Sequence, residues 1–318
     1  MRYALTGGTG FLGTALAGRL HANGHALRAL ARDPDRATVL AGLGAELVPG
    51  DLDDVAALDR LAADVDGLFH VAGLYTLGLR DTRAFDRINV EGTRHVLEAA
   101  RRNGVPRTVY TSTLAVNSDT EEQVVDESYH FDGVHLSHYD RSKAEAHTLA
   151  QEYAAAGLDV VVVQPGLIYG PGDTSQPGRL IREVALGRRP LAPRGGGVCW
   201  AHVDDVANGH LLAMASGRRG SSYHLAGDRM SLADGLRLVA TIAGTKGPLL
   251  VPAKLIRVSA ALSGRVEKVL PMPSEFAAET MRASLATYYG NPAKAERELG
   301  WTHRPVEQGL RETVAALR

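Results

Sequence analysis

A tyrosine and a lysine stand four residues apart near the middle of the chain, at Tyr139 and Lys143. In a helix this spacing places two side chains on one face, one turn apart. A free tyrosine has a pKa of about 10, too high for easy proton exchange at neutral pH, and a nearby ammonium lowers it. The pair therefore predicts a general acid or base, with Tyr139 exchanging the proton and Lys143 tuning it.

Hydroxyl residues end an apolar run upstream of this pair, at Tyr110-Thr111-Ser112-Thr113. In an open α/β fold the carboxyl end of a strand borders the crevice that binds ligands. A hydroxyl there can hydrogen-bond a substrate oxygen as its charge changes, and we assign this role to Thr113. Capping of the local backbone is the alternative, which we prefer for Ser112. Ser112 lacks the flanking glycines of a nucleophile elbow, which argues against a serine hydrolase.

A glycine-rich turn near the N-terminus has the sequence Thr6-Gly7-Gly8-Thr9-Gly10-Phe11-Leu12-Gly13. It follows an apolar run and precedes a helical pattern, the context in which such glycines bind a dinucleotide. Gly7 permits the turn, Gly10 lets a pyrophosphate approach the backbone, and Gly13 lets the helix pack on the strand. The free N–H groups and positive end of that helix favour the diphosphate. We expect Thr9, Phe11 and Leu12 to complete this phosphate site.

The residues after the second predicted strand bear on the choice between NAD and NADP. NAD sites usually place an acid there for the ribose hydroxyls, but this strand ends Leu30-Ala31-Arg32. Arg32 and Arg36 suit a ribose 2′-phosphate, because guanidinium groups form charge-assisted hydrogen bonds with phosphate. Asp33 would serve an NAD ribose if the strand ended one residue later. We expect NADP, with NAD as the alternative.

The third predicted strand closes with Gly50-Asp51-Leu52. A carboxylate and an apolar neighbour at this position can flank an adenine ring. A helix N-cap is an equally good interpretation of Asp51. We include Asp51 and Leu52 in the candidate cofactor site with that alternative open.

Apolar runs and amphipathic runs alternate through the first half of the chain, which is typical of parallel strands joined by crossover helices. The predicted strands are Tyr3–Thr6, Ala26–Ala31, Glu46–Pro49, Gly67–Val71, Thr108–Thr111 and Asp159–Gln164. The predicted helices are Gly10–Asn23, Val55–Ala63, Asn89–Asn103 and Tyr139–Ala156, and Gly24, Gly104 and Gly157 suit left-handed positions at helix ends. The pattern predicts an α/β fold with a doubly wound parallel sheet.

After Pro165 the pattern loosens into glycine- and proline-rich stretches, which we interpret as loops and short helices of a smaller substrate lobe. Short strands at Val198–His202 and Ser222–Leu225 surround a helix at Asp204–Ser216. We therefore expect a Rossmann domain over residues 1–170 and a C-terminal α/β substrate lobe over residues 171–318, partly interleaved.

Composition narrows the classes of partner. The 35 Lys and Arg nearly balance the 36 Asp and Glu, so we expect no nucleic acid and no membrane as partner. A single cysteine, Cys199, is consistent with a reducing cytoplasm. The N-terminus lacks the pattern of a secretory signal, and no apolar stretch is long enough for a membrane-spanning helix. The histidines lack metal-ligand spacing, so we expect no metal.

These residues resemble the extended branch of the short-chain dehydrogenase/reductase superfamily over essentially the whole chain. The motifs that carry the resemblance, in order, are Thr6–Gly13, Asp51-Leu52, His70-Val71-Ala72, Asn89–Thr93 (NVEGT), Thr111–Thr113, Tyr139 with Lys143, Pro165–Asp173 (PGLIYGPGD) and Trp200–Val206 (WAHVDDV). Within it the chain is most similar to the dihydroflavonol-reductase-like group and to bacterial relatives named hopanoid-associated sugar epimerases, including the tail Asn291–Trp301. These names imply different chemistries, so the resemblance leaves the reaction open.

The resemblance also implies roles for single residues. Tyr139 would be the acid or base, Lys143 would tune it and hold the nicotinamide ribose, and Thr113 would orient the substrate oxygen. The remaining residues that the resemblance assigns to the cofactor cleft are Val71, Ala72, Gly73, Asn89, Thr111, Pro165 and Gly166. Relatives commonly have serine where this chain has Thr113, and alanine where it has Gly73. The first difference preserves the hydroxyl, and the second is expected to widen the cleft.

The leading hypothesis is an NADPH-dependent carbonyl reductase acting on a small-molecule carbonyl or alcohol, with Tyr139 supplying the proton. A nucleotide-sugar epimerase or dehydratase with tightly bound NAD would use the same residues, and arginines between Gly172 and Arg194 are candidates to hold a sugar diphosphate. A non-catalytic dinucleotide-sensing protein is the alternative from another class. The helices Asn89–Asn103 and Tyr139–Ala156 commonly pair between subunits in this superfamily, so we also expect a homodimer, although their apolar faces serve their own sheet equally well.

Overall fold

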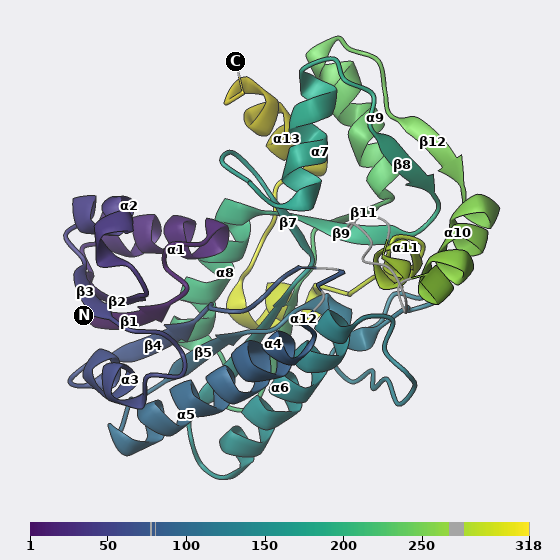
Figure 1. Cartoon of the computed structure of the whole chain (residues 1–318). Helices are drawn as coiled ribbons and strands as arrows, with labels where there is room; N and C mark the ends of the chain where they lie inside the picture. Colours follow the sequence, from purple (N-terminus) through teal and green to yellow (C-terminus); the bar gives the residue numbers. More distant parts are fainter. Residues whose placement is uncertain (77, 80, 267–276, 318) are drawn as a thin grey trace.

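The computed structural model describes residues 1–76, 78–79, 81–266 and 277–317, and a parallel sheet of seven strands forms its centre (Figure 1). The strand order is β10-β6-β5-β4-β1-β2-β3, and every neighbouring pair runs parallel. The strands are β1 (Arg2–Thr6), β2 (Ala26–Ala31), β3 (Glu46–Pro49), β4 (Gly67–His70), β5 (Thr108–Thr111), β6 (Val160–Pro165) and β10 (Ser222–Leu225). The doubly wound α/β fold expected from the sequence is confirmed, and the order reverses between β1 and β4, where such sheets bind ligands.

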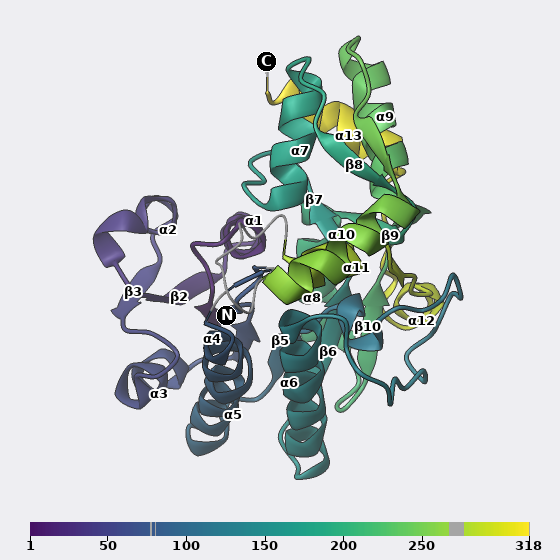
Figure 2. The same ribbon diagram turned by 45° about the vertical axis from the view of Figure 1, so that its right-hand side comes forward.

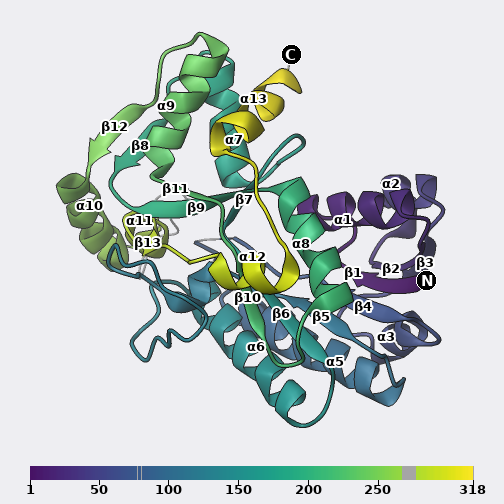
Figure 3. The same ribbon diagram turned by 180° about the vertical axis from the view of Figure 1, so that it is seen from behind.

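Side chains alternate between the two faces of this sheet, and helices cover both faces. Leu5 packs on one face with Leu16 and Val206, whereas its neighbour Ala4 packs on the other face with Leu58 and Val96. The first face is covered by α1 (Phe11–Ala22), α8 (Val203–Ser216) and the end of α12 (Ala293–Leu299), and the second by α3 (Val55–Ala62), α5 (Gly92–Arg102) and α6 (His138–Ala155). Figure 3 shows α8 and α12 from behind the sheet.

The helix predicted over Asn89–Asn103 differs at its start. A wider π-helical turn (η2, Asp86–Glu91) precedes α5, and Asn89 is buried within that turn. The apolar residues of α5 pack on their own sheet with α3 and α6. The expected homodimer through α5 and α6 stays a prediction.

The C-terminal half adds a second lobe above the carboxyl ends of the main strands (Figure 1). Its sheet runs β11-β9-β13, with β7 also paired to β9, and a separate pair joins β8 to β12. These strands are β7 (Leu167–Tyr169), β8 (Leu191–Arg194), β9 (Gly197–His202), β11 (Asp228–Met230), β12 (Leu249–Pro252) and β13 (Thr287–Tyr288). The helices are α7 (Gln176–Ala185), α9 (Leu232–Ala243), α10 (Ala253–Val266), α11 (Ala278–Ala283) and α13 (Val306–Ala315), and short turns elsewhere are α2 (Thr38–Gly42), α4 (Arg83–Phe85), η1 (Pro34–Arg36) and η3 (Leu114–Asn117).

The second lobe is more regular than expected. Where the sequence predicted loops and short helices, α9, α10 and α13 have 12, 14 and 10 residues. The buried Trp200 of β9 explains part of this order, because residues of α7, α9 and α13 pack around it in one apolar cluster. The strand β10 returns to the main sheet from beyond residue 170, so the chain crosses between the lobes more than once; the division at residue 170 stays a prediction.

Within the described ranges, none of the helices combines the length and apolar composition needed to cross a lipid bilayer.

Candidate functional site

A cavity of about 820 Å³ lies between the carboxyl edge of the main sheet and the second lobe. Residues that follow β1, β2, β3, β4, β5 and β6 all contribute to its wall, and α7, β9 and α11 close it from the lobe. This is the crevice in which open α/β sheets bind ligands. Most of the candidate residues identified from the sequence line it.

The glycine turn forms one end of the cavity. Gly7 has a φ of +74°, and a Cβ there would lie 2.6 Å from the Ala72 backbone nitrogen, so only glycine suits this position. A Cβ at Gly13 would lie 2.0 Å from the Gly7 carbonyl oxygen, because α1 packs tightly against the turn. α1 begins after Gly10 with no side-chain cap, so the N–H groups of its first turn face the cavity without a side-chain partner. Thr9, Phe11 and Leu12 line the same end, and the turn fits a dinucleotide pyrophosphate.

At the end of the cavity expected to hold the adenosine, the structure separates two arginines that were predicted to act together. β2 ends at Ala31, and Arg32 then lines the cavity. Arg36 lies in the exposed turn η1, outside the cavity wall, so the structure does not support its assignment to the 2′-phosphate, which stays a prediction. Asp33 also lies outside the wall.

Asp51 and Leu52 line this end as expected. The alternative interpretation of Asp51 as a helix cap is wrong, because the cap of α3 is Asp54, whose carboxylate accepts from the Ala57 N–H. Asp51 instead accepts from the Asp53 N–H at 2.9 Å. Leu52 packs so closely against Gly92 that a Cβ on that glycine would lie 2.8 Å from Leu52 Cδ1.

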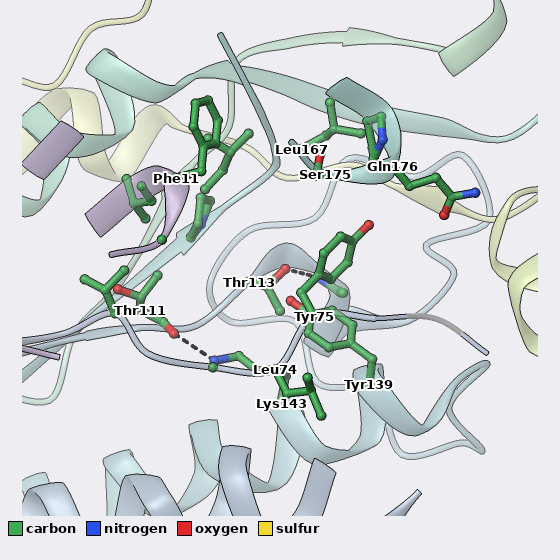
Figure 4. Close-up of a pocket in the computed structure, with 18 of the residues that line it drawn as sticks. Phe11, Leu74, Tyr75, Thr111, Thr113, Tyr139, Lys143, Leu167, Ser175 and Gln176 are labelled. Carbon is green, nitrogen blue, oxygen red and sulfur yellow. Dashed lines mark hydrogen bonds between the residues drawn. The ribbon is translucent and has the colours of Figure 1, made fainter. Parts of the chain in front are cut away.

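Tyr139 lies at the start of α6 and faces two other hydroxyl side chains. Its ring makes an edge contact with Tyr75, with 5.0 Å between ring centres and 76° between planes. Thr113 lies beside it, and Figure 4 shows the three side chains gathered at one wall of the cavity. Burial and the neighbouring Tyr75 raise the pKa of Tyr139 well above its ordinary value, and the Thr113 hydroxyl acts in the opposite direction. The direction is the reverse of that expected from a nearby ammonium.

The hydrogen bonds of Lys143 explain why it does not lower the pKa of Tyr139, because its ammonium donates to other groups. Nζ donates to the Tyr110 hydroxyl at 2.9 Å. It also donates to the Thr111 carbonyl oxygen at 2.8 Å (Figure 4). Burial lowers the pKa of Lys143 to about 7, so its charge is itself costly here. Thr111 takes part through its backbone, since its hydroxyl lies 2.8 Å from His210 Nε2. The spacing of Tyr139 and Lys143 gave their common helix face correctly but not their partners.

Asn89 is a predicted cofactor residue that the structure moves behind the cavity wall. Its amide accepts from the Leu74 N–H at 2.7 Å and donates to the Ser142 hydroxyl at 2.9 Å, so it is fully used between the 73–74 loop and α6. Gly73 does line the cavity, and a Cβ there would lie 3.4 Å from Asn89 Oδ1 and 3.9 Å from Lys143 Nζ. A side chain at Gly73 would therefore narrow the cleft beside Lys143, in keeping with the expectation.

Ser112 has a histidine partner that sequence analysis did not find, and its predicted capping of the local backbone is wrong, because Thr113 instead accepts from the Ala115 N–H at 3.2 Å. Its hydroxyl lies 2.9 Å from His147 Nδ1, while His147 Nε2 lies 3.3 Å from the Ser222 hydroxyl. Burial, with a contribution from Lys143, lowers the pKa of His147 to about 4. The second ring nitrogen thus faces a serine instead of the carboxylate of a hydrolase triad.

Two carboxylates at the start of α6 also escaped sequence analysis. Asp140 Oδ2 accepts from the Tyr288 hydroxyl at 3.2 Å, and burial raises the pKa of Asp140 to about 7 despite hydrogen bonds from Ser137 and Tyr288. Glu279 of α11 accepts from the Gly78 N–H at 2.7 Å and from the His138 N–H at 3.2 Å. The spacing of Ser137 and Asp140 matches a capping box and was readable from the sequence. The partners Tyr288 and Glu279 come from the other lobe, and no local pattern indicates them.

The remaining cofactor candidates border the middle of the cavity. Val71, Ala72, Pro165 and Gly166 all line it, and a Cβ at Gly166 would lie 2.2 Å from the Cys199 carbonyl oxygen. Cys199 itself is buried, and burial raises the pKa of its thiol to about 11. In the part of the chain that the structure describes, no group of three His, Cys, Asp or Glu residues could hold a metal ion.

The substrate half of the cavity is largely apolar. Side chains from the second lobe and the 73–75 loop form most of this wall: Leu74, Tyr75, Leu167, Leu180, Val198, Leu232, Ala283 and Ala286, with Thr174, Ser175, Gln176, Thr280, Ser284 and Tyr288 as polar groups. The carboxyl groups of Asp140 and Asp173 also line it. Among the described residues, the positively charged side chains of the whole wall are Arg32, Arg87 and Lys143. The arginines considered for a sugar diphosphate, namely Arg179, Arg182, Arg188, Arg189 and Arg194, lie outside it.

Comparisons with known proteins agree with this geometry. The model of the NAD dependent epimerase/dehydratase family matches residues 3–226. A putative dihydroflavonol 4-reductase of Synechocystis sp. is 35% identical and covers 98% of this chain and 93% of its own. A 4-hydroxy-2-methyl-3-oxo-4-farnesyl-3,4-dihydroquinoline-1-oxide ketoreductase of Stigmatella aurantiaca is 34% identical, with 98% and 95% covered.

Two solved structures share the fold. The crystal structure of gox2253 is 32% identical, has a TM-score of 0.87 and covers 100% of this chain and 98% of its own. The dTDP-glucose 4,6-dehydratase DesIV from Streptomyces venezuelae, solved with NAD bound, is 24% identical, with a TM-score of 0.81 and coverage of 99% and 96%. The second likeness shows the fold alone.

Proposed function

The chain belongs to the NAD dependent epimerase/dehydratase family and is an NAD(P)-dependent enzyme of the extended short-chain dehydrogenase/reductase type, and from this premise we propose that it is an NADPH-dependent reductase of an apolar ketone or aldehyde. The observation that carries the proposal is the wall of the substrate half, where apolar side chains predominate around Tyr139 and, of the described cations in the cavity wall, Lys143 alone shares its helix face.

The residues of the first lobe fit the cofactor in this proposal. The first turn of α1 would hold the pyrophosphate, Arg32 the 2′-phosphate, and Lys143 the nicotinamide ribose. When bound, the reduced nicotinamide supplies the hydride for the carbonyl carbon. Arg32 supports NADP over NAD because Arg32 lines the cavity, whereas Asp33, the acid that would bind ribose hydroxyls, is not part of its wall.

Tyr139 is suited to give a proton during reduction. Because burial raises its pKa, the phenol holds its proton at neutral pH. In the proposed step the phenol O–H donates to the carbonyl oxygen, which becomes an alcohol, while the Thr113 hydroxyl orients that oxygen. The apolar wall excludes water from the reacting atoms.

The rival function is a nucleotide-sugar epimerase or dehydratase, which returns the hydride to its substrate. A sugar diphosphate would require cationic partners in the substrate half, and those considered from the sequence lie outside the cavity wall. The names of the two similar reductases further support net reduction. The third alternative, a non-catalytic sensor, is set aside because the family and these relatives are enzymes.

The test is binding of NADPH and NADH followed by loss of nicotinamide absorbance with a panel of ketones and aldehydes. We expect tighter binding of NADPH and net consumption with apolar carbonyls. In Tyr139→Phe, consumption should fall by about 10² to 10⁴-fold while NADPH binding is retained, because only the proton donor is lost. Tyr75→Phe is the matched control, since it removes a neighbouring hydroxyl and keeps the ring contact. Tight NAD binding with turnover of a nucleotide sugar and no net consumption would replace the proposal with the rival.

A further inference from the structure

Helix α10 has apolar residues on two opposite sides. Ile256 and Ala260 are buried against the lobe. Leu255, Val258 and Leu262 face outward, with 58%, 67% and 60% of their surface exposed. A helix that packs on one side normally presents polar residues on the other, so this outward face requires an explanation.

The outward residues form a narrow stripe with cations beside it. At 3.6 residues per turn, Leu255, Val258 and Leu262 fall within an arc of about 60°. Lys254 and Arg257 are exposed on one flank of that arc. Neither cation forms an ion pair with another described residue, and both side chains are exposed to solvent.

The sequence around α10 departs from the balanced charge of the whole chain. Residues 253–266, which form α10, contain Lys254, Arg257 and Arg265 and no Asp or Glu, whereas the whole chain has 35 Lys and Arg against 36 Asp and Glu. The next acid along the sequence is Glu267. An apolar stripe bordered by cations, on a helix that contains no acid, matches the pattern of helices that lie in the surface of an anionic membrane.

The position of α10 connects this face to the cavity. α10 packs beside α11, and Figure 2 shows the two helices side by side at the front of the second lobe. Thr280 and Ala283 of α11 line the cavity. Figures 1 and 3 both place α10 at the outer edge of that lobe, away from the helices of the main sheet.

We propose that α10 binds the surface of a membrane that contains anionic lipids, with Leu255, Val258 and Leu262 at the boundary of headgroups and acyl chains and with Lys254 and Arg257 against lipid phosphates. Three side chains are too few for a stable protein interface, which usually takes about 800 Å² from each partner. This binding revises the expectation of no membrane partner, which rested on the net charge of the whole chain. It does not depend on the proposed reductase activity.

The test is flotation of the full chain with vesicles of phosphatidylcholine alone and of phosphatidylcholine with phosphatidylglycerol. We expect binding to the second composition only, weakened by added salt. Lys254→Gln with Arg257→Gln should lower binding by about tenfold or more, and serine at Leu255, Val258 and Leu262 should abolish it. Far-UV circular dichroism and the unfolding midpoint should stay unchanged, because all five side chains are exposed.

Matched controls change equally exposed residues on other elements. Serine at Val39, Val55 and Val134, and glutamine at Arg83 and Arg219, should leave vesicle binding intact. No binding to anionic vesicles at low salt, or binding that the α10 variants do not reduce, would overturn the proposal. So would a dimeric mass in light scattering that becomes monomeric in the apolar triple variant, because that result assigns the face to a second copy of the chain.

Discussion

Tyr139 and Lys143 share one face of α6, yet their polar atoms have different partners. The phenol lies beside Thr113 and Tyr75, while the ammonium binds Tyr110 and the Thr111 carbonyl. Burial raises the pKa of Tyr139 and lowers the pKa of Lys143, so it favours the neutral form of both groups. A neutral phenol is the form that donates a proton, which links this residue-scale feature to reduction of a carbonyl.

Arg32 gives a residue-scale prediction about cofactor choice. Arg32→Ala should weaken NADPH binding by about 10- to 100-fold, since a hydrogen bond between charged groups contributes about 1.5–3 kcal/mol. NADH binding should change little, because NADH lacks the phosphate. Arg36→Ala is the control, and it should leave both affinities unchanged because Arg36 lies outside the cavity wall. Equal effects of the two substitutions, measured by titration calorimetry, would contradict the assignment.

Asp140 gives a prediction about stability and pH. Burial raises its pKa from 3.8 to about 7, so between these values the folded state binds the proton and the unfolded state releases it. The contribution of Asp140 to the free energy of unfolding therefore falls as pH rises from about 4 to about 7. Asp140→Asn copies the protonated form and should remove this loss. Relative to the wild type, the variant should gain about 1 kcal/mol or more between pH 4 and pH 8.

Denaturant unfolding at several pH values checks this prediction. Asp33→Asn is the matched control, because Asp33 is exposed and outside the cavity wall. Parallel pH profiles for Asp140→Asn and the wild type would show that Asp140 titrates normally in the folded protein.

At the scale of elements, the start of α6 is held by groups from the second lobe. Tyr288 of β13 donates to Asp140, and Glu279 of α11 accepts from the His138 N–H in the first turn of α6. Glu279 also accepts from the Gly78 N–H, so one carboxylate joins the loop beyond Tyr75 to the helix that carries Tyr139. A carboxylate at this end of a helix is favoured by the helix dipole.

Glu279→Gln tests this tie between elements. The amide keeps one acceptor oxygen but loses the charge and leaves one N–H without its partner. We expect the free energy of unfolding to fall by about 1–2 kcal/mol and kcat/KM for the ketone to fall with it, since Tyr139 is less firmly positioned. Glu307→Gln, which breaks an exposed ion pair with Arg311, should cost less than about 1 kcal/mol. Unchanged stability and kcat/KM in Glu279→Gln would rule out the positioning role.

At the scale of the whole molecule, two lobes with different surfaces meet at one cavity. The first lobe contributes backbone N–H groups and Arg32, and the second contributes a mainly apolar wall. In the proposed reductase, the first lobe would bind the phosphates of the cofactor and the second would surround most of an apolar carbonyl substrate.

This division predicts how activity depends on the substrate chain. In a series of methyl ketones, kcat/KM should rise about three- to fourfold for each added methylene, because each buried CH₂ contributes about 0.8 kcal/mol, until the wall is filled. Ketones of equal length that end in a carboxylate are the control, and they should be poorer substrates. A flat series, or a preference for the charged ketones, would contradict an apolar substrate class.

The sequence determined the parts that depend on local pattern. Short apolar runs between amphipathic ones, together with turn glycines, indicated the strands of the main sheet to within a residue or two. The glycine turn gave the cofactor end, because a tight strand-to-helix turn permits few residue types. The pairing of Tyr139 with Lys143 on one helix face followed from helical periodicity in the same way.

Tertiary structure alone decided what depends on contacts between distant segments. It left Arg36 and Asn89 outside the cavity wall, brought Glu279 and Tyr288 to the start of α6, and kept the arginines of residues 179–194 off the substrate wall. It also left Leu255, Val258 and Leu262 outside the core, although as residue types they favour burial. Burial and contacts between distant segments determine the pKa values, the chemistry of the substrate wall and which apolar residues stay exposed. Local spacing in the sequence does not show these contacts.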